Sequence, residues 1–594
     1  MLSERRRGAF PLAFLGRVGV AWAAVSALLL FIHWSAINAL RFPDPDDAMR
    51  LIQVRDLLGG QSWFDLTQYR VDAASGGVAM HWSRIVDLPI VLTILALTPF
   101  VGGQTAELAA LVGVPLVTLG IAMLLAARIA WRLMGDEEAT LTSMVLALSI
   151  PVLFQLSPMR IDHHGWQIVC ALVAINGLMA RSPRTGGWVI GTATAVWLSI
   201  SIEGLPLAAV IFAVLALRWL RNRDARVLLT SAIQSLAAIS LALFLGTRGW
   251  SDLATYCDAI SPVHLLMFLW GAVVLGIVAR AEPAPRGVIL GGFMVAGGGA
   301  LSAFLLAAPQ CSAGGFAALD PVVAENWHAH VLEGMPIWKQ SLTTALQYAV
   351  TPLIALIAAI NLSTRSRDWL RQFWADYAMI LGGAFLVSLL VARAGAVACV
   401  LAAPPLAWQL RQWLRAIRQM KRPPARIAAM CGVACALLPA LPAMLLASAI
   451  PARASLSEVT GGPIKAADCA IQNHANVLGA LPEGEFYAPL DIAPEILLST
   501  GHTVLATGHH RGNSGMKLLI ETALASETRA REALIARGTN YVALCPQLSE
   551  ARMYARLAPQ GFIADLVSGN TPAWLEPIEL EGPAGVKVWR IKPE

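Results

Sequence analysis

An apolar segment at positions 14–40, FLGRVGVAWAAVSALLLFIHWSAINAL, runs directly into a charged stretch, Arg41-Phe-Pro-Asp44-Pro45-Asp46-Asp47-Ala-Met-Arg50. The apolar segment is long enough to cross the ~30 Å hydrocarbon core of a bilayer as a helix. The charged stretch then places a group of carboxylates and an arginine at one membrane surface. Such a group suits a divalent cation and a phosphate better than it suits packing. The junction therefore predicts a membrane protein with a candidate site at its surface.

The composition supports a polytopic membrane protein. The chain has 594 residues, of which 57% are hydrophobic and 14% are charged, and its mean hydropathy is +0.61. Soluble domains carry about 25% charged residues. The first apolar run is too long, and lacks the cleavage pattern, to be a removable signal peptide. The net charge of +6 comes mostly from loop arginines, so it indicates topology, and no basic stripe with interleaved aromatic residues indicates a nucleic-acid partner.

The cationic loops predict the topology, because Lys and Arg collect on the cytoplasmic side. These loops are 5–7, 128–132, 181–184, 218–226, 280–286, 365–371 and 411–426. Placing all of them in the cytoplasm requires thirteen spans, at 14–40, 108–134, 139–157, 165–181, 187–202, 204–221, 227–246, 262–280, 287–309, 343–362, 376–393, 395–411 and 425–449. The N-terminus is then cytoplasmic and the C-terminus external. The short run 88–101 has no cationic cytoplasmic end, so it is interpreted as an interfacial or re-entrant segment.

We expect a transmembrane domain at 1–451 and an external α/β domain at 452–594. External loops fall at 41–106, 158–164 and 310–342. The tail alternates predicted strands at 485–489, 503–506, 541–545 and 586–591 with helices at 492–499 and 514–537, a pattern typical of small α/β domains. Cys469 and Cys545 both fall in this domain, and in an oxidising compartment they either form a disulfide or stay free.

Two interpretations are open for the group of Asp44, Asp46, Asp47 and Arg50. Hard cations such as Mg²⁺ or Mn²⁺ take carboxylate oxygens together with substrate phosphate. The alternative is a solvated loop in which Asp47 caps a helix.

Three further groups fall on the same external side. Arg160-Ile-Asp162-His163-His164 lies between two apolar spans, where ionisable residues usually face a polar cavity; the alternative is a turn with its histidines among lipid headgroups. Glu333 lies in the third external loop. Arg393 ends the eleventh span, either as a snorkelling side chain or as a phosphate clamp. Glu203, at the outer end of the fifth span, receives no role.

These residues resemble the catalytic subunit of oligosaccharyltransferase. Asp44-Pro45 followed by Arg50, Gly60 and Phe64-Asp65 resembles the first external loop of that family. Asp162-His163-His164-Gly165 is similar to its Asp-Asn-Glu-Gly, with His164 in place of the metal-binding glutamate. His330-Val-Leu-Glu333-Gly-Met-Pro336 resembles its Ser-Val-Ser-Glu-x-x-Pro, and Arg393 falls where the family holds the lipid phosphate. The resemblance covers roughly 14–412 and implies a GT-C glycosyltransferase fold with about thirteen transmembrane helices.

The resemblance implies a sugar donor on a polyprenyl phosphate or diphosphate and a divalent metal, Mg²⁺ or Mn²⁺. Asp44 would bind the metal and act as base, and Asp162, His164 and Glu333 would complete the metal shell. Arg393, with Arg160, would neutralise the departing phosphate. Supporting roles fall to the neighbours of these residues, which are Asp46, Asp47, Arg50 and His163.

The tail departs from that family. Its sequence has no Trp-Trp-Asp-Tyr-Gly, the motif with which the family recognises peptide acceptors, and the similar Trp374-Ala-Asp376-Tyr377 is predicted to be cytoplasmic. The tail instead carries His509-His510-Arg511, either an acceptor-binding turn or a surface cluster. The acceptor, whether glycan, lipid or protein, is therefore not specified. A transporter or flippase is the alternative function, and it predicts ionisable residues near the bilayer midplane. The expected location is a bacterial inner membrane with a periplasmic tail.

Overall fold

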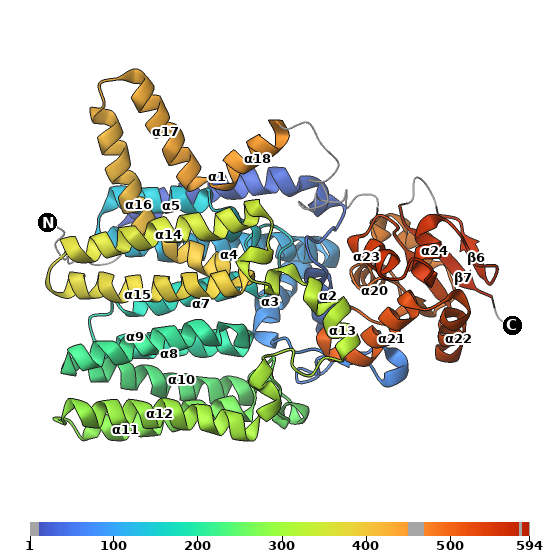
Figure 1. Cartoon of the computed structure of the whole chain (residues 1–594), viewed down its shortest axis with the longest axis horizontal. Coiled ribbons are helices and arrows are strands. Elements are labelled where there is room, and N and C mark those ends of the chain that lie inside the picture. Colours follow the sequence, from blue (N-terminus) through green and yellow to red (C-terminus); the bar gives the residue numbers. More distant parts are fainter. Residues whose placement is uncertain (1–10, 450–468, 581–584, 593–594) are drawn as a thin grey trace.

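The computed structural model describes residues 11–449, 469–580 and 585–592. The cationic segment 5–7 and the predicted boundary at 451–452 lie outside these residues. The described chain forms a long helical bundle with a smaller α/β domain, the tail, docked on one end of it (Figure 1). The bundle and the tail meet through the external loops, so the candidate site lies where they join.

Most of the bundle helices lie side by side along the long axis of the molecule, whereas α17 and the adjoining end of α16 project away from the bundle (Figure 1). The bundle helices are α1 (Leu12–Asn38), α4 (Gly103–Leu133), α5 (Asp136–Ala147), α6 (Ile150–Phe154), α7 (His164–Gly177), α8 (Pro183–Ile200), α9 (Leu205–Arg221), α10 (Arg226–Thr247), α11 (Pro262–Arg280), α12 (Arg286–Ala307), α14 (Leu342–Arg365), α15 (Asp368–Leu390), α16 (Gly395–Gln419), α17 (Pro423–Leu437) and α18 (Ala440–Ala449). Within the described ranges, nine helices are long and apolar enough to cross a membrane.

Two predicted spans are not continuous helices. The span 139–157 breaks at Leu148 and Ser149, between α5 and α6, and the span 425–449 breaks between α17 and α18, directly before Pro439. In the first case Pro151, at the second position of α6, has no N–H to donate to the carbonyl of Ala147, so α5 does not continue into α6. A residue that precedes proline is disfavoured in the α conformation, which explains the second break. In the second case Leu438 leaves the helical region with φ −125° and ψ 67°. The last span is therefore a bent pair of shorter helices.

The predicted interfacial run is a continuous helix, α3 (Arg84–Val101), and it is among the nine helices that meet the length and composition criteria. It packs antiparallel to the start of α4 after a turn at Gly102, whose φ is +79°. Leu92, Leu95 and Phe100 are exposed on it. Its placement along the membrane surface stays a prediction.

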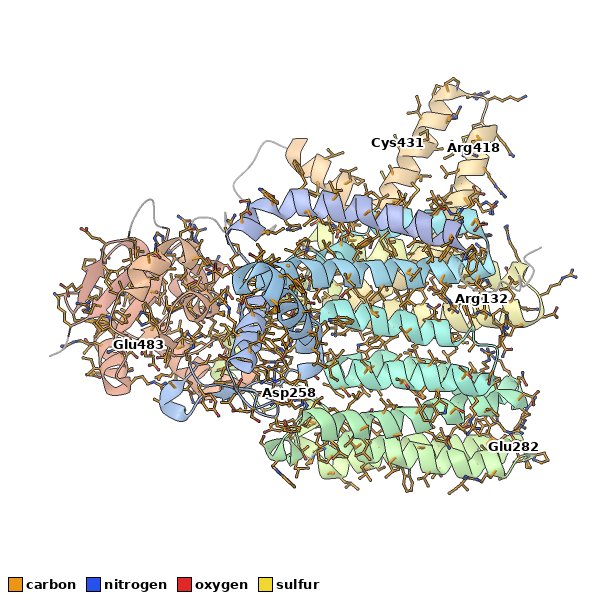
Figure 2. The ribbon with its side chains drawn as sticks, turned by 180° about the vertical axis from the view of Figure 1, so that it is seen from behind. Arg132, Asp258, Glu282, Arg418, Cys431 and Glu483 are labelled. Atoms are coloured by element: carbon orange, nitrogen blue, oxygen red, sulfur yellow. A yellow bond between two sulfur atoms is a disulfide. The ribbon has the colours of Figure 1, made fainter. Side chains whose placement is uncertain are left out.

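The cationic ends of the bundle lie opposite the tail. Figure 2 shows Arg132 and Arg418 at the end of the bundle that is remote from the tail, together with Glu282 in the cationic loop 280–286. All of these loops, within the described residues, were predicted to share one side. The structure thus agrees with the charge-based assignment of sides for these loops.

The external loops contain short elements that face the tail. They are α2 (Pro45–Leu58), the antiparallel pair β1 (Thr67–Gln68) and β2 (Val78–Ala79), and α13 (Pro321–Asn326). The remainder of the loop 310–342 is built mostly of short 3₁₀ turns, one of which holds Glu333. A disulfide joins Cys257, in the loop before α11, to Cys311 in this loop.

The tail is a five-stranded sheet flanked by helices. Its strands are β3 (Glu485–Tyr487), β4 (Thr503–Val504), β5 (Tyr541–Leu544), β6 (Leu575–Ile578) and β7 (Lys587–Ile591), in the order β4-β3-β5-β7-β6. Its helices are α19 (Ala475–Gly479), α20 (Ala493–Ser499), α21 (Asn513–Leu524), α22 (Glu527–Arg537), α23 (Ser549–Leu557) and α24 (Phe562–Ser568). Strands β4, β3 and β5 are parallel, and β7 and β6 are antiparallel additions. The predicted strands and helices are present, and the Cys469–Cys545 disulfide is formed.

The first external loop extends the sheet of the tail. Residue Val71 pairs with Val504 of the edge strand β4, and the backbone N–H of Asp72 donates to the carbonyl of Val504 at 2.9 Å. The two segments also share one hydrophobic core, in which Ile52 of α2 packs with Phe486 of β3. The tail is therefore fixed to the first external loop both by backbone pairing and by a shared hydrophobic core.

Candidate functional site

Asp44 begins α2 and also faces the candidate site. One of its carboxylate oxygens accepts a hydrogen bond from the backbone N–H of Asp46 at 3.0 Å, and Pro45 occupies the first helical position. This is a standard N-cap arrangement. The predicted cap was Asp47, which is wrong, because the helix already starts at Pro45. The second oxygen of Asp44 lies 3.1 Å from Nη1 of Arg160. Asp44 therefore takes the capping role that was predicted for Asp47, and binding of a cation by this group stays a prediction.

Asp47 links α2 to the second external loop. It is fully buried, and one carboxylate oxygen accepts from the backbone N–H groups of Ile161 and Asp162 at 2.8 and 2.9 Å. The other oxygen accepts from Nη1 of Arg160 at 2.8 Å. Because both of its carboxylate oxygens are engaged, Asp47 fixes the position of the second external loop against α2. The side chain of Arg160 contacts both Asp44 and Asp47.

Arg50 anchors a buried ionic network that the sequence patterns did not reveal. Its guanidinium donates to Asp87 at 2.9 Å and to Asp162 at 3.3 Å, and it lies over the ring of Trp82. Asp87 also accepts from Gln53 at 2.7 Å. Asp87 directly precedes the apolar run 88–101, and no spacing rule could have singled it out.

Asp162, His163 and His164 bring three potential ligand atoms within 4.8 Å of one another. Nδ1 of His163 lies 2.5 Å from Oδ1 of Asp162, and Nε2 of His164 lies 3.4 Å from Oδ2. Among the residues that the structure describes, this Oδ2 atom is buried with no hydrogen-bond partner. A buried carboxylate oxygen left free beside an imidazole nitrogen fits a divalent cation, because both are metal-ligand groups.

Arg393 and Glu333 meet in the same region. Arg393 lies in a 3₁₀ turn (Ala392–Ala394) between α15 and α16, and its Nη2 is 3.3 Å from Oε1 of Glu333. Its Nη1 is paired with Glu203, to which the sequence patterns had assigned no role. Glu203 in turn lies 3.9 Å from Nε2 of His163. The structure therefore joins the second loop, the third loop and the turn after α15 through one chain of ion pairs.

The surroundings shift the pKa of two of these groups. Partial burial raises the pKa of Glu333 to about 7, against the opposing effect of the Arg393 charge. Burial disfavours the charged form of His163, but the adjacent Asp162 carboxylate outweighs it and raises the pKa of His163 to about 9. Perturbed groups of this kind gather at functional sites.

The three tail residues 509–511 do not act as one cluster. His509 is buried, and its Nε2 lies 3.3 Å from Oδ1 of Asp46. His510 and Arg511 instead hold Asp258, with Nε2 of His510 at 2.6 Å and two Arg511 nitrogens at 2.7 and 2.8 Å. Figure 2 shows Asp258 at the boundary between bundle and tail. That these residues bind an acceptor stays a prediction.

Asp258 also belongs to a second potential metal group, with His81 and His510. The bidentate pair with Arg511 already occupies both oxygens of this carboxylate, whereas Oδ2 of Asp162 has no hydrogen-bond partner among the described residues. We therefore interpret this group as a contact between domains.

The fold resembles that of solved membrane glycosyltransferases. The archaeal oligosaccharyltransferase AglB from Archaeoglobus fulgidus, in complex with an inhibitory peptide and a dolichol-phosphate, matches 95% of this chain and 72% of its own length with a TM-score of 0.64 and 15% identity. The same enzyme in complex with Zn and sulfate gives a TM-score of 0.60 at 13% identity, over 91% and 69% of the two chains. ArnT from Cupriavidus metallidurans in the apo state gives 0.40 at 13% identity, over 97% and 100%.

Comparisons of the sequence itself return no match. No family model matches the chain, and no curated protein matches it. At these identities the likeness to solved structures shows the fold alone. The chain has the fold of the GT-C membrane glycosyltransferases.

Proposed function

We propose that this protein is a glycosyltransferase that moves a sugar or glycan from a polyprenyl phosphate or diphosphate to an acceptor. The reaction would take place on the side of the membrane that carries the tail. The observation that carries this proposal is the continuous set of charged contacts from Asp44 through Arg160 to the second loop, and from Asp162 through His163 and Glu203 to Arg393 and Glu333. The AglB structure that contains dolichol-phosphate supports a lipid-linked donor for this fold.

Two independent features support the proposed side of the membrane. The cationic loops lie at the end of the bundle opposite the tail, as the positive-inside rule requires of a cytoplasmic face. Both disulfides, Cys257–Cys311 and Cys469–Cys545, lie at the tail end. Disulfides persist in oxidising compartments such as the bacterial periplasm. Both features support our proposal that the tail end is the external face, and the membrane that we propose is a bacterial inner membrane.

Asp44, Asp162 and His164 would hold a divalent cation, Mg²⁺ or Mn²⁺, at the free oxygen of Asp162. When bound, such a cation stabilises negative charge on phosphate oxygens. Arg160 lies 3.1 Å from Asp44 and is almost fully buried, so it orients that carboxylate. We assign the donor phosphate to Arg393, in the turn that follows α15.

In the transfer step, the acceptor hydroxyl or amine attacks the anomeric carbon of the donor sugar. The bond between that carbon and the phosphate oxygen breaks, and the phosphate leaves on the polyprenyl chain with the bonding electrons. Asp44 takes the proton from the acceptor. Arg393 neutralises the charge that develops on the departing phosphate, since fixed cations stabilise such charge best when they are preorganised. Glu333, on a loop of short turns, orients Arg393 and closes the site over the substrates.

A panel of polyprenyl-linked sugars tests this proposal. The purified protein in proteoliposomes is incubated with each donor, and the released polyprenyl phosphate is identified by mass spectrometry. Asp44→Asn and Glu333→Gln should lower turnover by about 10²-fold or more, the scale of a lost charge-stabilising or acid–base group. Asp224→Asn, at an exposed aspartate of the remote end, is the matched control. Full activity in both site variants would contradict the proposal.

A further inference from the structure

An apolar cavity of about 160 Å³ lies inside the bundle, away from the charged contacts. It is bounded by α5, α6, α14, α16 and the bend between α17 and α18. Its lining includes Val145, Ile150, Thr351, Cys399, Leu438 and Met444. An apolar cavity of ~150 Å³ is large enough to take a benzene-sized ligand. This one therefore has room for a short length of hydrocarbon chain.

The cavity lies close to the candidate site, displaced from it along the helix axes toward the interior of the bundle. Cys399 is six residues after Arg393, which corresponds to about 9 Å along a helix. The Cys399 thiol lies 3.8 Å from the carbonyl of Gln347, which also lines the cavity. The next residue, Tyr348, covers Gly395 so closely that a Cβ there would lie 2.6 Å from its ring. Tyr348 thus contacts Gly395, two residues after Arg393, and directly follows Gln347, which lines the cavity.

The cavity opens sideways, toward the bilayer. Several lining residues are also exposed on the outer surface of the bundle, among them Ile150, Leu441 and Met444. An opening bordered by such large apolar side chains admits a lipid chain more readily than water. The bend before Pro439 creates this opening, because a straight last helix would not turn α18 away from the axis of α17.

The donor has a different path along the bundle. Arg393 follows α15, and the exposed Leu390 and Leu386 lie about one and two turns before it, on that helix. A donor whose phosphate binds Arg393 can lay its polyprenyl chain on this face. Among the described residues, no side chain of α9 or α15 lines the cavity. The site is therefore reached from the membrane along two separate faces.

We propose that the cavity receives an acyl chain of a membrane lipid that carries the acceptor group. This proposal rests on the proposed transferase function and adds the class of acceptor. A donor alone requires one path from the bilayer, whereas transfer between two lipids requires two. An unbranched acyl chain is narrower than an isoprenoid chain, which suits a cavity of this size. With its chain held here, the headgroup of the lipid would lie at the level of Asp44.

Photolabelling of the full-length protein in lipid nanodiscs tests the proposal. One probe is phosphatidylethanolamine with a diazirine on its acyl chain, and the other is polyprenyl phosphate with a diazirine on a terminal isoprene. Labelled peptides are mapped by mass spectrometry. Thr351→Phe and, as a milder change, Ser149→Leu fill the cavity from two sides. Leu353→Phe, at an exposed leucine of α14 that does not line the cavity, is the control.

The acyl probe should label the segments 145–151 and 399–406, and each filling variant should lower this labelling by about tenfold. This factor corresponds to two methylene groups of the acyl chain that the filled cavity no longer buries, at ~0.8 kcal/mol each. Leu353→Phe should leave the labelling unchanged. The polyprenyl probe should label α15 and not these segments. With a radiolabelled donor, filling should also lower the sugar recovered on acyl lipids, once these are separated from unreacted donor by thin-layer chromatography, while slow hydrolysis of the donor by water continues.

Three results would overturn the proposal: labelling of the cavity by the polyprenyl probe, acyl labelling that filling does not change, or no labelling of the cavity at all. Failure of the unmodified protein to release sugar from any donor would instead contradict the proposed function. The labelling arm does not depend on turnover, so the two failures are distinguishable.

Discussion

At the scale of single residues, buried charges decide how the loops assemble. Asp87 accepts from Arg50, Gln53 and Arg84 with all four side chains buried, so no water can replace a lost partner. Arg50 extends this network to Asp162. The geometry at the candidate metal site therefore depends on a carboxylate that does not itself face the substrates.

Removal of Asp87 should destabilise the protein strongly. Asp87→Ala leaves two buried guanidinium groups without this partner, which costs about 3–5 kcal/mol. Glu107→Ala is a matched control, because Glu107 pairs with the partly exposed Arg55, and such pairs contribute about 0–1 kcal/mol. Thermal unfolding in detergent measures both. Equal melting temperatures for the two variants would contradict this account.

The metal proposal makes a separate prediction. Removal of divalent cations with a chelator should stop sugar transfer, and added Mn²⁺ or Mg²⁺ should restore it, since Oδ2 of Asp162 has no hydrogen-bond partner among the described residues. Asp162→Asn should weaken Mn²⁺ binding by about 10–100-fold, the scale of altered metal-site ligation. A Mn²⁺ titration followed by electron paramagnetic resonance measures the affinity for the cation independently of enzymatic turnover. Unchanged affinity in Asp162→Asn would remove Asp162 from the ligand set.

The sequence could predict only the residues that carry a motif or a topological position. Asp44, Asp162, Glu333 and Arg393 could be named because charge patterning put them at one face and their neighbours matched a family pattern. Asp87 could not, since a buried ion pair between distant segments leaves no period or spacing. Glu203 is similar, because only the folded chain brings it to Arg393.

At the scale of elements, apolar runs predicted the helices but not their breaks. The strands and helices of the tail were predicted from their alternation, and four of the five observed strands lie where they were predicted. Strand β6 was missed, because Pro577 inside it argues against a strand. It is tolerated there because β6 lies at the edge of the sheet. The Cys257–Cys311 disulfide was also missed, since two loops separated by α11 and α12 show no pairing in the sequence.

This disulfide should order the third external loop. The disulfide joins two cysteines that are 54 residues apart in the sequence, and the double variant Cys257→Ser with Cys311→Ser removes this cross-link. The loop-closure entropy of a segment of this length limits the loss of stability to about 4 kcal/mol. We expect faster hydrogen exchange in 312–341, measured by mass spectrometry. The control is Cys431→Ser with Cys435→Ser, two exposed free cysteines of α17. Exchange that is equally slow in both double variants would show that other contacts order this loop.

At the scale of the whole molecule, the tail acts as a lid that is fixed at several points. The first loop pairs with β4, Lys517 of α21 binds Asp320 at 2.9 Å, and Arg511 binds Asp258. Arg511 also lies over the ring of Tyr256. Because His509 precedes this contact, the same turn that docks the tail also brings a histidine to Asp46. Docking of the tail and completion of the site are therefore coupled.

Loss of the Arg511–Asp258 pair should loosen the tail and impair transfer together. Arg511→Ala leaves a largely buried carboxylate without its bidentate partner, and truncation of one member of such a pair costs about 2–5 kcal/mol. Asp258→Ala in the same background should cost little more, because the two residues act as a unit, and a double-mutant cycle measures this coupling. The rate of hydrogen exchange in 507–513 measures how tightly the tail is docked, and the rate of donor turnover measures whether the candidate site still works. Arg529→Ala, on the distant helix α22, is the control. Faster exchange with unchanged turnover would separate docking from catalysis and show that His509 is not needed at Asp46.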